Sequence, residues 1–406
     1  MITEKMRLAE TTHAPPHVSL VTIALAYLRV GATAFGFAIL QQLKAVALGR
    51  GWLTEEEFNE GLALVQLYPG PIMVDLTAYV GYKLRGALGA VVATTCFILP
   101  SFILMLVLSA LYFALGNLPW VHPLFLGLEA LVVGILAQIT LDLGARNVQS
   151  RAQAVIALVA FAALLFKINA ILIVLGALAL GALFIRPEAK GRIADPRETK
   201  STSTTWRQWA GIGIVVAVVL AVAGFAGSLQ SDIGAMGLVF FKIGAVAFGN
   251  GTTIIPLIQA DVVDAQHWLS LNQFADGIAL GQITPGPFLI TAAFVGYKMG
   301  GVFGATLATF AMFSPSFAMT LIFTEIFARL RNLKPIRGAL AGVLASFVGL
   351  LAVVILQLGG VALTTPAALA LAAAAFVAVR WFKLDVVWVF VGGIAVWATL
   401  LAVGVA

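Results

Sequence analysis

The chain consists largely of apolar stretches of about 20 residues, and their length limits what it can fold into. An α-helix of about 20 residues spans the ~30 Å hydrocarbon core of a bilayer, whereas strands of a membrane barrel are shorter and alternate in polarity. Hydrophobic residues make up 61% of the chain and charged residues 10%, too few charges to cover a soluble protein of 406 residues. The sequence therefore predicts an all-α integral membrane protein.

We expect thirteen transmembrane segments: six within residues 19–186, one at 208–227 and six within 236–406. The first segment of each six is expected as one helix, at about 19–40 and 236–258. A polar, basic connector separates the halves. The expected divisions are a cytoplasmic tail (1–18), a first repeat (19–186), a connector with a linking helix (187–235) and a second repeat (236–406). Because 152–186 is too long for one crossing, a hairpin is expected near Lys167 and Asn169.

The two halves repeat one another in sequence. QLYPGPIMVDLTAYVGYK (66–83) matches QITPGPFLITAAFVGYK (282–298), and LRVGATAFG (28–36) matches FKIGAVAFG (241–249). Since one extra crossing separates the two units, the second is expected to be upside down relative to the first, as in many secondary transporters. The basic residues agree with this topology. With the N-terminus in the cytoplasm, 18 of the 24 lysines and arginines fall in inside loops and 4 in outside loops.

Each half carries a Pro-Gly-Pro motif inside an apolar segment, at Pro69-Gly70-Pro71 and Pro285-Gly286-Pro287. Proline lacks a main-chain N–H and glycine permits unusual dihedral angles, so both helices should be broken there, whether the segments span or re-enter. A broken helix exposes N–H groups and a positive dipole end, which favour an oxyanion. A packing kink is the alternative. Gln66 and Gln282 precede the motifs by three residues, so they lie near the breaks and can donate to an anion or satisfy freed carbonyl groups.

Two basic residues, Arg29 and Lys242, occupy the same position in the two repeats, near the middle of their segments. A cation at that depth costs ~2.5–3.5 kcal/mol on insertion scales, so it needs a partner, water or a substrate. Brought together by inverted symmetry, the two cations would suit a small dianion. Alternatively, each pairs with a carboxylate or extends to the membrane interface.

Two acidic residues are candidates for carrying a coupled proton. Asp75 follows the first Pro-Gly-Pro motif, and Glu129 lies in a later apolar segment. A role for Asp75 as counter-ion of Arg29 is the alternative. Asp276, six residues before Gln282, is expected at the membrane interface.

Few residues in the sequence support any other class of function. The single cysteine, Cys96, leaves no internal disulfide, and the four histidines have no metal-ligand spacing. No nucleotide-binding motif or nucleophile–base pair occurs, so we expect neither a cofactor nor an enzyme. The net charge of +6 is explained by membrane orientation without a nucleic-acid partner. An ion gradient, the membrane potential or another protein must supply the energy.

The paired Gln-x-x-Pro-Gly-Pro elements, each followed by Val-Gly-Tyr, resemble the long-chain, two-domain chromate ion transporter family, as do FGNG (248–251) and WLSLNQFADGIALGQITPGP (268–287). The resemblance implies efflux of chromate across the bacterial plasma membrane, driven by the membrane potential or a proton gradient, and chromate resistance. It adds Asn250 of FGNG to the candidate substrate-binding residues. Chromate and sulfate are both tetrahedral dianions, so sulfate or another small oxyanion is the alternative substrate. A homo-oligomer is compatible with the sequence.

Overall fold

The computed structural model describes residues 18–36, 38–115, 121–185, 206–229, 231–249, 251–330 and 334–404. Nearly all of the expected tail, most of the connector and Asn250 lie outside these ranges. The described residues are almost entirely helical, as predicted. One two-residue parallel ladder, between β1 (Gly70–Pro71) and β2 (Phe248–Gly249), is the exception among them.

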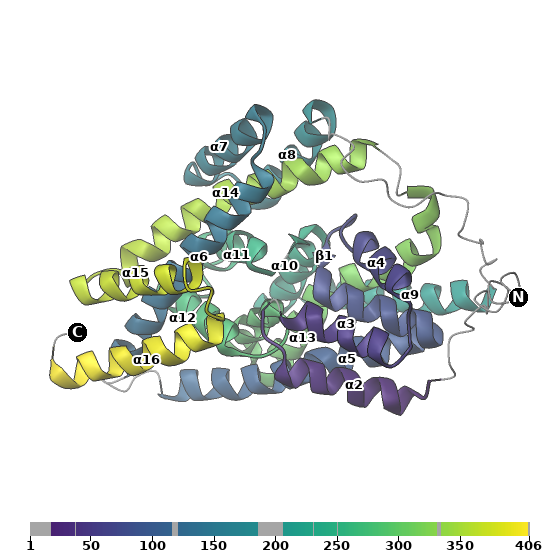
Figure 1. Ribbon diagram of the computed structural model, residues 1–406, viewed down its shortest axis with the longest axis horizontal. Coiled ribbons are helices and arrows are strands. Elements are labelled where there is room, and N and C mark those ends of the chain that lie inside the picture. Colours follow the sequence, from purple (N-terminus) through teal and green to yellow (C-terminus); the bar gives the residue numbers. More distant parts are fainter. Residues whose placement is uncertain are drawn as a thin grey trace, which may run out of the picture.

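The helices of the two halves follow the same order (Figure 1). The first half contains α2 (Leu20–Thr33), α3 (Ala38–Gly49), α4 (Glu55–Leu64), α5 (Ile72–Leu115), α6 (Val121–Asn147), α7 (Arg151–Leu165) and α8 (Ala170–Phe184). After α9 (Trp206–Ser228), the second half contains α10 (Asp232–Val246), η1 (Gly251–Ile254), α11 (Ile255–Gln259), η2 (Ala260–Ala265), α12 (Leu271–Ile283), η3 (Phe288–Ile290), α13 (Thr291–Leu330), α14 (Lys334–Ala362), α15 (Pro366–Arg380) and α16 (Val386–Val403).

Six stretches of the described helices are long and apolar enough to cross a membrane. They are Ile72–Leu115, Pro123–Asn147, Gln208–Ser228, Phe288–Ile326, Arg337–Ala362 and Val386–Val403. Four further apolar helices, α2, α7, α8 and α15, are shorter. The chain is therefore a multi-pass membrane protein, and the thirteen crossings and the inverted orientation of the repeats stay predictions.

The long elements α5 and α13 each contain a sharp reversal. At Arg85–Gly86 the dihedrals are φ −144°, ψ 26° and then φ 61°, ψ −152°, and at Gly300–Gly301 they are φ −159°, ψ 31° and φ 57°, ψ −141°. Glycine takes the second, left-handed conformation without a steric penalty. Beyond the turn the two arms meet so closely that a Cβ on Gly81 would lie 2.4 Å from the Gly89 carbonyl oxygen, and Gly296 makes the same contact in the second repeat.

The helices that precede the two Pro-Gly-Pro motifs begin in the same way. Thr54 accepts a hydrogen bond from the main-chain N–H of Glu57, whose carboxylate accepts one from the N–H of Thr54. Ser270 and Gln273 make the same reciprocal pair at the start of α12. These capping boxes satisfy N–H groups that the first turn of a helix leaves free, so they fix where each of the two helices starts.

The hairpin expected near Lys167 is confirmed, and it occurs twice. Lys167 adopts a φ of 59°, and the Asn169 side chain then caps α8 by accepting hydrogen bonds from two main-chain N–H groups. In the second half Lys383 has a φ of 53° and Asp385 caps α16. The repeated FKIN and FKLD sequences therefore form equivalent turns.

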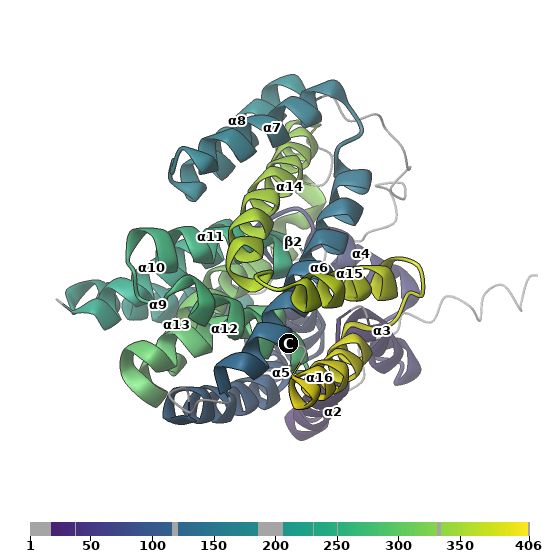
Figure 2. The same cartoon turned by 90° about the vertical axis from the view of Figure 1, so that its left-hand side faces the viewer.

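The last two helices of each half pack on one helix of the other half (Figures 1 and 2). In the first half α7 and α8 lie along α14, and in the second half α15 and α16 lie along α6. Glycines allow close approach: a Cβ on Gly134 of α6 would lie 2.1 Å from the Ala372 carbonyl oxygen of α15, and one on Gly349 of α14 would lie 2.0 Å from that of Ala157 in α7. The two repeats are thus interleaved.

The first apolar segment of each repeat is broken, contrary to the expectation of single helices over 19–40 and 236–258. α2 ends at Thr33 and α10 at Val246, and the next residues, Ala34 and Ala247, have extended dihedrals. Sequence hydropathy hides these breaks because the interrupting residues are themselves apolar or glycine. The main chain freed at each break pairs elsewhere in the molecule, and that pairing builds the candidate site.

Candidate functional site

Each Pro-Gly-Pro loop lies against the helix break of the other repeat. The first loop contains β1, which pairs in parallel with β2 at the break after α10. In the second loop, the main-chain N–H of Gly286 donates to the carbonyl oxygen of Ala34, 2.9 Å away, at the break after α2. The four interruptions of the two repeats are therefore joined in crosswise pairs.

Both Pro-Gly-Pro motifs interrupt their helices, as predicted. The first separates α4 from α5, and the second separates α12 from η3. Gly286 has a φ of 95°, which side chains rarely allow. The loops are backed by equivalent serines: a Cβ on Gly70 would lie 2.7 Å from the Ser316 Cβ, and one on Gly286 would lie 3.1 Å from the Ser101 Cβ. The first proline of each motif, Pro69 and Pro285, is partly exposed, and the remaining four residues, Gly70, Pro71, Gly286 and Pro287, are buried.

The two glutamines that precede the motifs differ in their surroundings. Gln66 is exposed, whereas Gln282 is half-buried and its Nε2 is a buried donor without a hydrogen-bond partner among the described residues. An unmade buried hydrogen bond costs about 1–3 kcal/mol, so such a donor suits a ligand that would complete it. Of the two glutamines, Gln282 therefore has the buried donor that a ligand could complete.

The two candidate cations, Arg29 and Lys242, lie about one helical turn before the ends of α2 and α10, and both side chains are exposed. The ion pairs within 4 Å in the described part of the chain join Lys44 to Glu55 and Arg380 to Asp142, so they include neither cation. Lys242 is close enough to Asp261 for their charges to interact. The described contacts do not bring Arg29 and Lys242 together.

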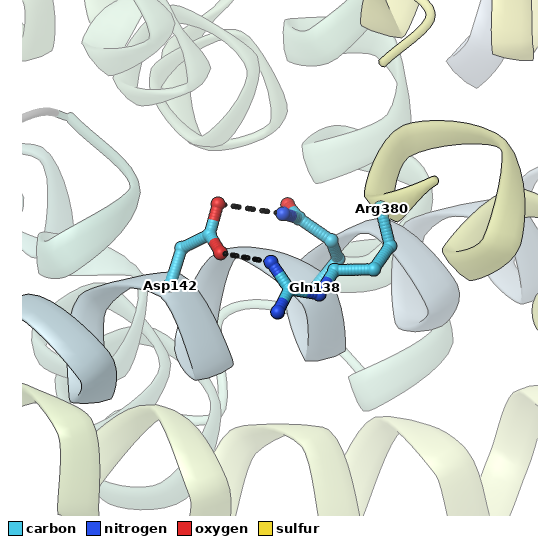
Figure 3. A network of polar contacts seen from close by, with 3 residues as sticks. All are labelled: Gln138, Asp142 and Arg380. Atoms are coloured by element: carbon cyan, nitrogen blue, oxygen red, sulfur yellow. Dashed lines mark hydrogen bonds and ion pairs between the residues drawn. The ribbon is translucent and has the colours of Figure 1, made fainter. Parts of the chain in front are cut away.

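Arg380 illustrates how this fold holds a structural cation (Figure 3). Its Nη1 lies 3.2 Å from Oδ1 of Asp142, and Nε2 of Gln138 donates to the other oxygen of that carboxylate at 2.6 Å. The cluster joins α15 to α6, and each carboxylate oxygen has its own donor. Arg380 thus links two helices, α15 and α6, and is not part of the helix breaks.

Asp75 lies directly under the first Pro-Gly-Pro loop, with an exposure of 0%. A Cβ on Gly70 would come within 1.9 Å of its Oδ2. The side chains of Ser316 and Thr320 face the carboxylate, yet their hydroxyls donate to main-chain carbonyls 3.2 and 2.9 Å away. Both Asp75 oxygens are buried and form no hydrogen bond of normal geometry with the described residues, although the two hydroxyl groups lie beside them. The groups that face Asp75 are hydroxyls, and Arg29 is exposed, so the counter-ion alternative gains no support.

Glu129 is also buried, and its carboxyl group contacts that of Asp276 on α12. Asp276, which was expected at the membrane interface, is enclosed by other helices. Its exposure is 5%, and its Oδ2 accepts a hydrogen bond from the Tyr112 hydroxyl at 2.6 Å. Asp276 is buried because α6 packs over the face of α12 that carries this carboxylate. Tyr112 and Asp276 are polar partners that sequence reasoning missed.

The breaks after α2 and α10 are also components of the site that sequence reasoning missed. A signal for them existed, because Ala-Phe-Gly recurs at 34–36 and 247–249 in the two repeats, with Gly36 and Gly249 both at positive φ. The hydroxyl of Thr253 donates to the Phe248 carbonyl and helps to hold the second break. Asn250 follows directly and lies outside the described residues.

Comparison with known proteins relates most of the chain to one group of transporters. A family model described as chromate transporter matches residues 21–182 and 234–398. An uncharacterized transporter of Methanocaldococcus jannaschii is 32% identical over 84% of this chain and 84% of its own length. A chromate transport protein of Cupriavidus metallidurans is 30% identical over 84% and 83%, and a chromate transport protein of Pseudomonas aeruginosa is 29% identical over 96% and 94%. No solved structure matches the chain.

Proposed function

The chain belongs to the chromate transporter family, and we propose that it is a secondary transporter that exports chromate across the bacterial plasma membrane. The family consists of transporters rather than enzymes. The observation that best supports a transport site in this chain is the crosswise pairing of the four helix breaks. Irregular main chain at membrane depth is tolerated only where protein or a water-filled cavity surrounds it.

The helix breaks suit an oxyanion. α5 begins directly after the first Pro-Gly-Pro loop, and η3 begins directly after the second. The start of a helix offers free N–H groups and the positive end of a dipole, both of which favour negative charge. We place the tetrahedral dianion between these starts, with the Gln282 Nε2 as a side-chain donor and Asn250 as a further candidate.

Arg29 and Lys242 would each attract the dianion toward the Pro-Gly-Pro loop of the other repeat. Arg29 lies five residues before Ala34, whose carbonyl accepts from the second Pro-Gly-Pro loop, and five residues of helix span about 7.5 Å. Lys242 stands in the same relation to β2 and the first loop. Because both side chains are exposed in the absence of lipid, we propose that they face an aqueous approach and draw the dianion toward the loops.

The topology proposed for transport has thirteen crossings, an N-terminus in the cytoplasm and two inverted repeats. Equivalent reversals at Arg85–Gly86 and Gly300–Gly301, and the excess of basic residues in inside loops, support it. Rocking of the two interleaved halves about the loops would expose the site to each side in turn. Asp75, buried under Gly70, and Glu129 are proposed to carry the coupled proton.

Uptake of radiolabelled chromate into inverted membrane vesicles tests this function, with and without an imposed membrane potential or pH gradient. We expect gradient-dependent uptake that vesicles lacking the protein do not show. A matched control is Lys44→Ala, which removes an exposed cation paired with Glu55 away from the loops. Excess sulfate in the same assay measures the selectivity between the two dianions. Absence of chromate uptake under every gradient, with the folded protein present, would refute export of chromate.

A further inference from the structure

We propose that Glu129 and Asp276 form one proton-binding site, through which a pH gradient drives the transporter. This inference rests on the proposed function, because it names the coupling ion and the second member of its site. The pair joins α6 of the first half to α12 of the second, so the bound proton lies at a contact between the repeats.

The pair is buried and short of hydrogen-bond donors. Glu129 is 2% exposed and Asp276 is 5% exposed. The Tyr112 hydroxyl donates to Oδ2 of Asp276, and Asn272 contacts the Glu129 carboxyl. Oε2 of Glu129 and Oδ1 of Asp276 are both buried without a partner among the described residues. Two carboxyl groups in contact form a hydrogen bond only if one of them carries a proton, so a single shared proton satisfies both groups.

The described surroundings supply no cation that could replace the proton. On α13, Lys298 lies over the Phe113 ring, with its Nζ 5.2 Å from the ring centroid. On α15, Arg380 is paired with Asp142. Arg337 stands near the start of α14, and α16 carries no ionisable residue. The polar side chains that contact the pair are those of Tyr112 and Asn272. Asp142, on the same helix as Glu129, shows the contrast, since a guanidinium balances its charge.

The position of the pair connects the proton to the substrate site. Asp276 lies six residues before Gln282 on α12, which leads into the second Pro-Gly-Pro loop. With one proton bound the pair has a net charge of −1, and after its release the charge is −2. Two adjacent buried carboxylates repel each other, so release of the proton pushes α12 away from α6. Proton binding from outside and release inside would thus alternate the position of the loop.

Infrared difference spectroscopy of the purified protein in lipid tests the proton directly, without transport. We expect a carbonyl band of a protonated carboxylic acid that shifts in deuterium oxide and disappears on alkaline titration. Glu129→Gln and Asp276→Asn should each remove the part of the titrating band that the pair contributes, whereas Asp142→Asn should leave the band unchanged. Because buried Asp75 can contribute a band of its own, the difference between wild type and variant decides the assignment. A band of unchanged intensity in both single variants would overturn it, as would absence of the band from the wild-type protein.

Reconstituted vesicles then test coupling. A pH gradient should stimulate chromate flux by wild-type protein and the Asp142→Asn variant at least severalfold. Glu129→Gln and Asp276→Asn should retain exchange of chromate for chromate and lose that stimulation. Stimulation equal to wild type in both variants would overturn the coupling role. If wild-type protein moves no chromate, the proposed function fails, and the infrared band decides the proton site separately. If the amide variants do not fold, Glu129→Asp and Asp276→Glu keep two carboxyl groups and should shift the band's titration.

Discussion

The main-chain N–H of Gly286 donates to the carbonyl oxygen of Ala34 across 2.9 Å, although 252 residues separate them in the chain. This bond fixes the second Pro-Gly-Pro loop to the first repeat, as the β1–β2 ladder fixes the first loop to the second repeat. Because each loop is held by the opposite repeat, movement of one half must carry the loop of the other. Substitutions at the loops should therefore affect transport more than the loss of a local contact suggests.

Replacing Gly286 should impair the protein in proportion to side-chain size. Its φ of 95° is strained for any side chain, and a Cβ would lie 3.1 Å from Ser101. Gly286→Ala is expected to cost about 1–3 kcal/mol of stability, and Gly286→Val more. Thermal unfolding in detergent, followed by size-exclusion chromatography, measures this loss. Gly213→Ala is the matched control, because nothing lies within 4 Å of a Cβ there. Equal melting temperatures for all three variants would contradict the prediction.

Gly70→Ala should conflict with Asp75, whose Oδ2 would lie 1.9 Å from the new Cβ. We expect a loss of about 1–3 kcal/mol from overpacking. Combining Gly70→Ala with Asp75→Ala should recover part of it, since the carboxylate is then absent. A double-mutant cycle in the same unfolding assay measures the coupling between the two residues. Strictly additive effects would show that the loop relaxes away from Asp75.

Arg29→Ala and Lys242→Ala should each lower chromate uptake by about tenfold, which corresponds to a loss of ~1.4 kcal/mol in attraction of the dianion. Arg29→Lys and Lys242→Arg should retain most of the activity, because the positive charge remains. Initial rates at several chromate concentrations are the measurement, with protein amount in the membrane determined for each variant. Uptake at the wild-type rate by both alanine variants would eliminate the cations from the site.

Tyr68→Phe tests the buried polar contact beside the first loop. The Tyr68 hydroxyl donates to Oγ1 of Thr320 at 2.7 Å, and its ring stacks on Phe323 with centroids 4.9 Å apart. Loss of the hydroxyl alone should cost about 1 kcal/mol, because the ring packing remains. Tyr68→Ala should cost more, since it also leaves a cavity. Equal melting temperatures for the wild-type protein and both variants would mean that neither ring nor hydroxyl stabilises the loop.

The features that sequence predicts correctly are those determined by residues close together in the chain. Pro-Gly-Pro breaks a helix wherever it occurs, and the turn at Lys167 follows from its own short segment. The break after α2 is different, because Ala34 is an ordinary helix former. Its extended conformation is stabilised by a hydrogen bond from Gly286, which no local pattern reveals.

The same distinction applies to the acidic residues. Glu129 is unusual in the sequence because it lies in an apolar segment, and the structure finds it buried. Asp276 lies in a more polar segment, whose composition agrees with an interfacial position. The packing of α6 and of Tyr112 from α5 on α12 buries it, and these contacts join residues in different repeats.

The interleaved packing of α14 with α7 and α8 also constrains how the protein is made. The α7–α8 hairpin leaves the ribosome roughly 150 residues before α14, so its partner surface does not yet exist when it enters the bilayer. In that interval lipid must cover the face that α14 later occupies, and assembly is completed by exchange of lipid for helix. A chain truncated after residue 330 would keep both Pro-Gly-Pro loops and still leave this hairpin without its partner. Biogenesis of the first half is thus finished only by the last quarter of the chain.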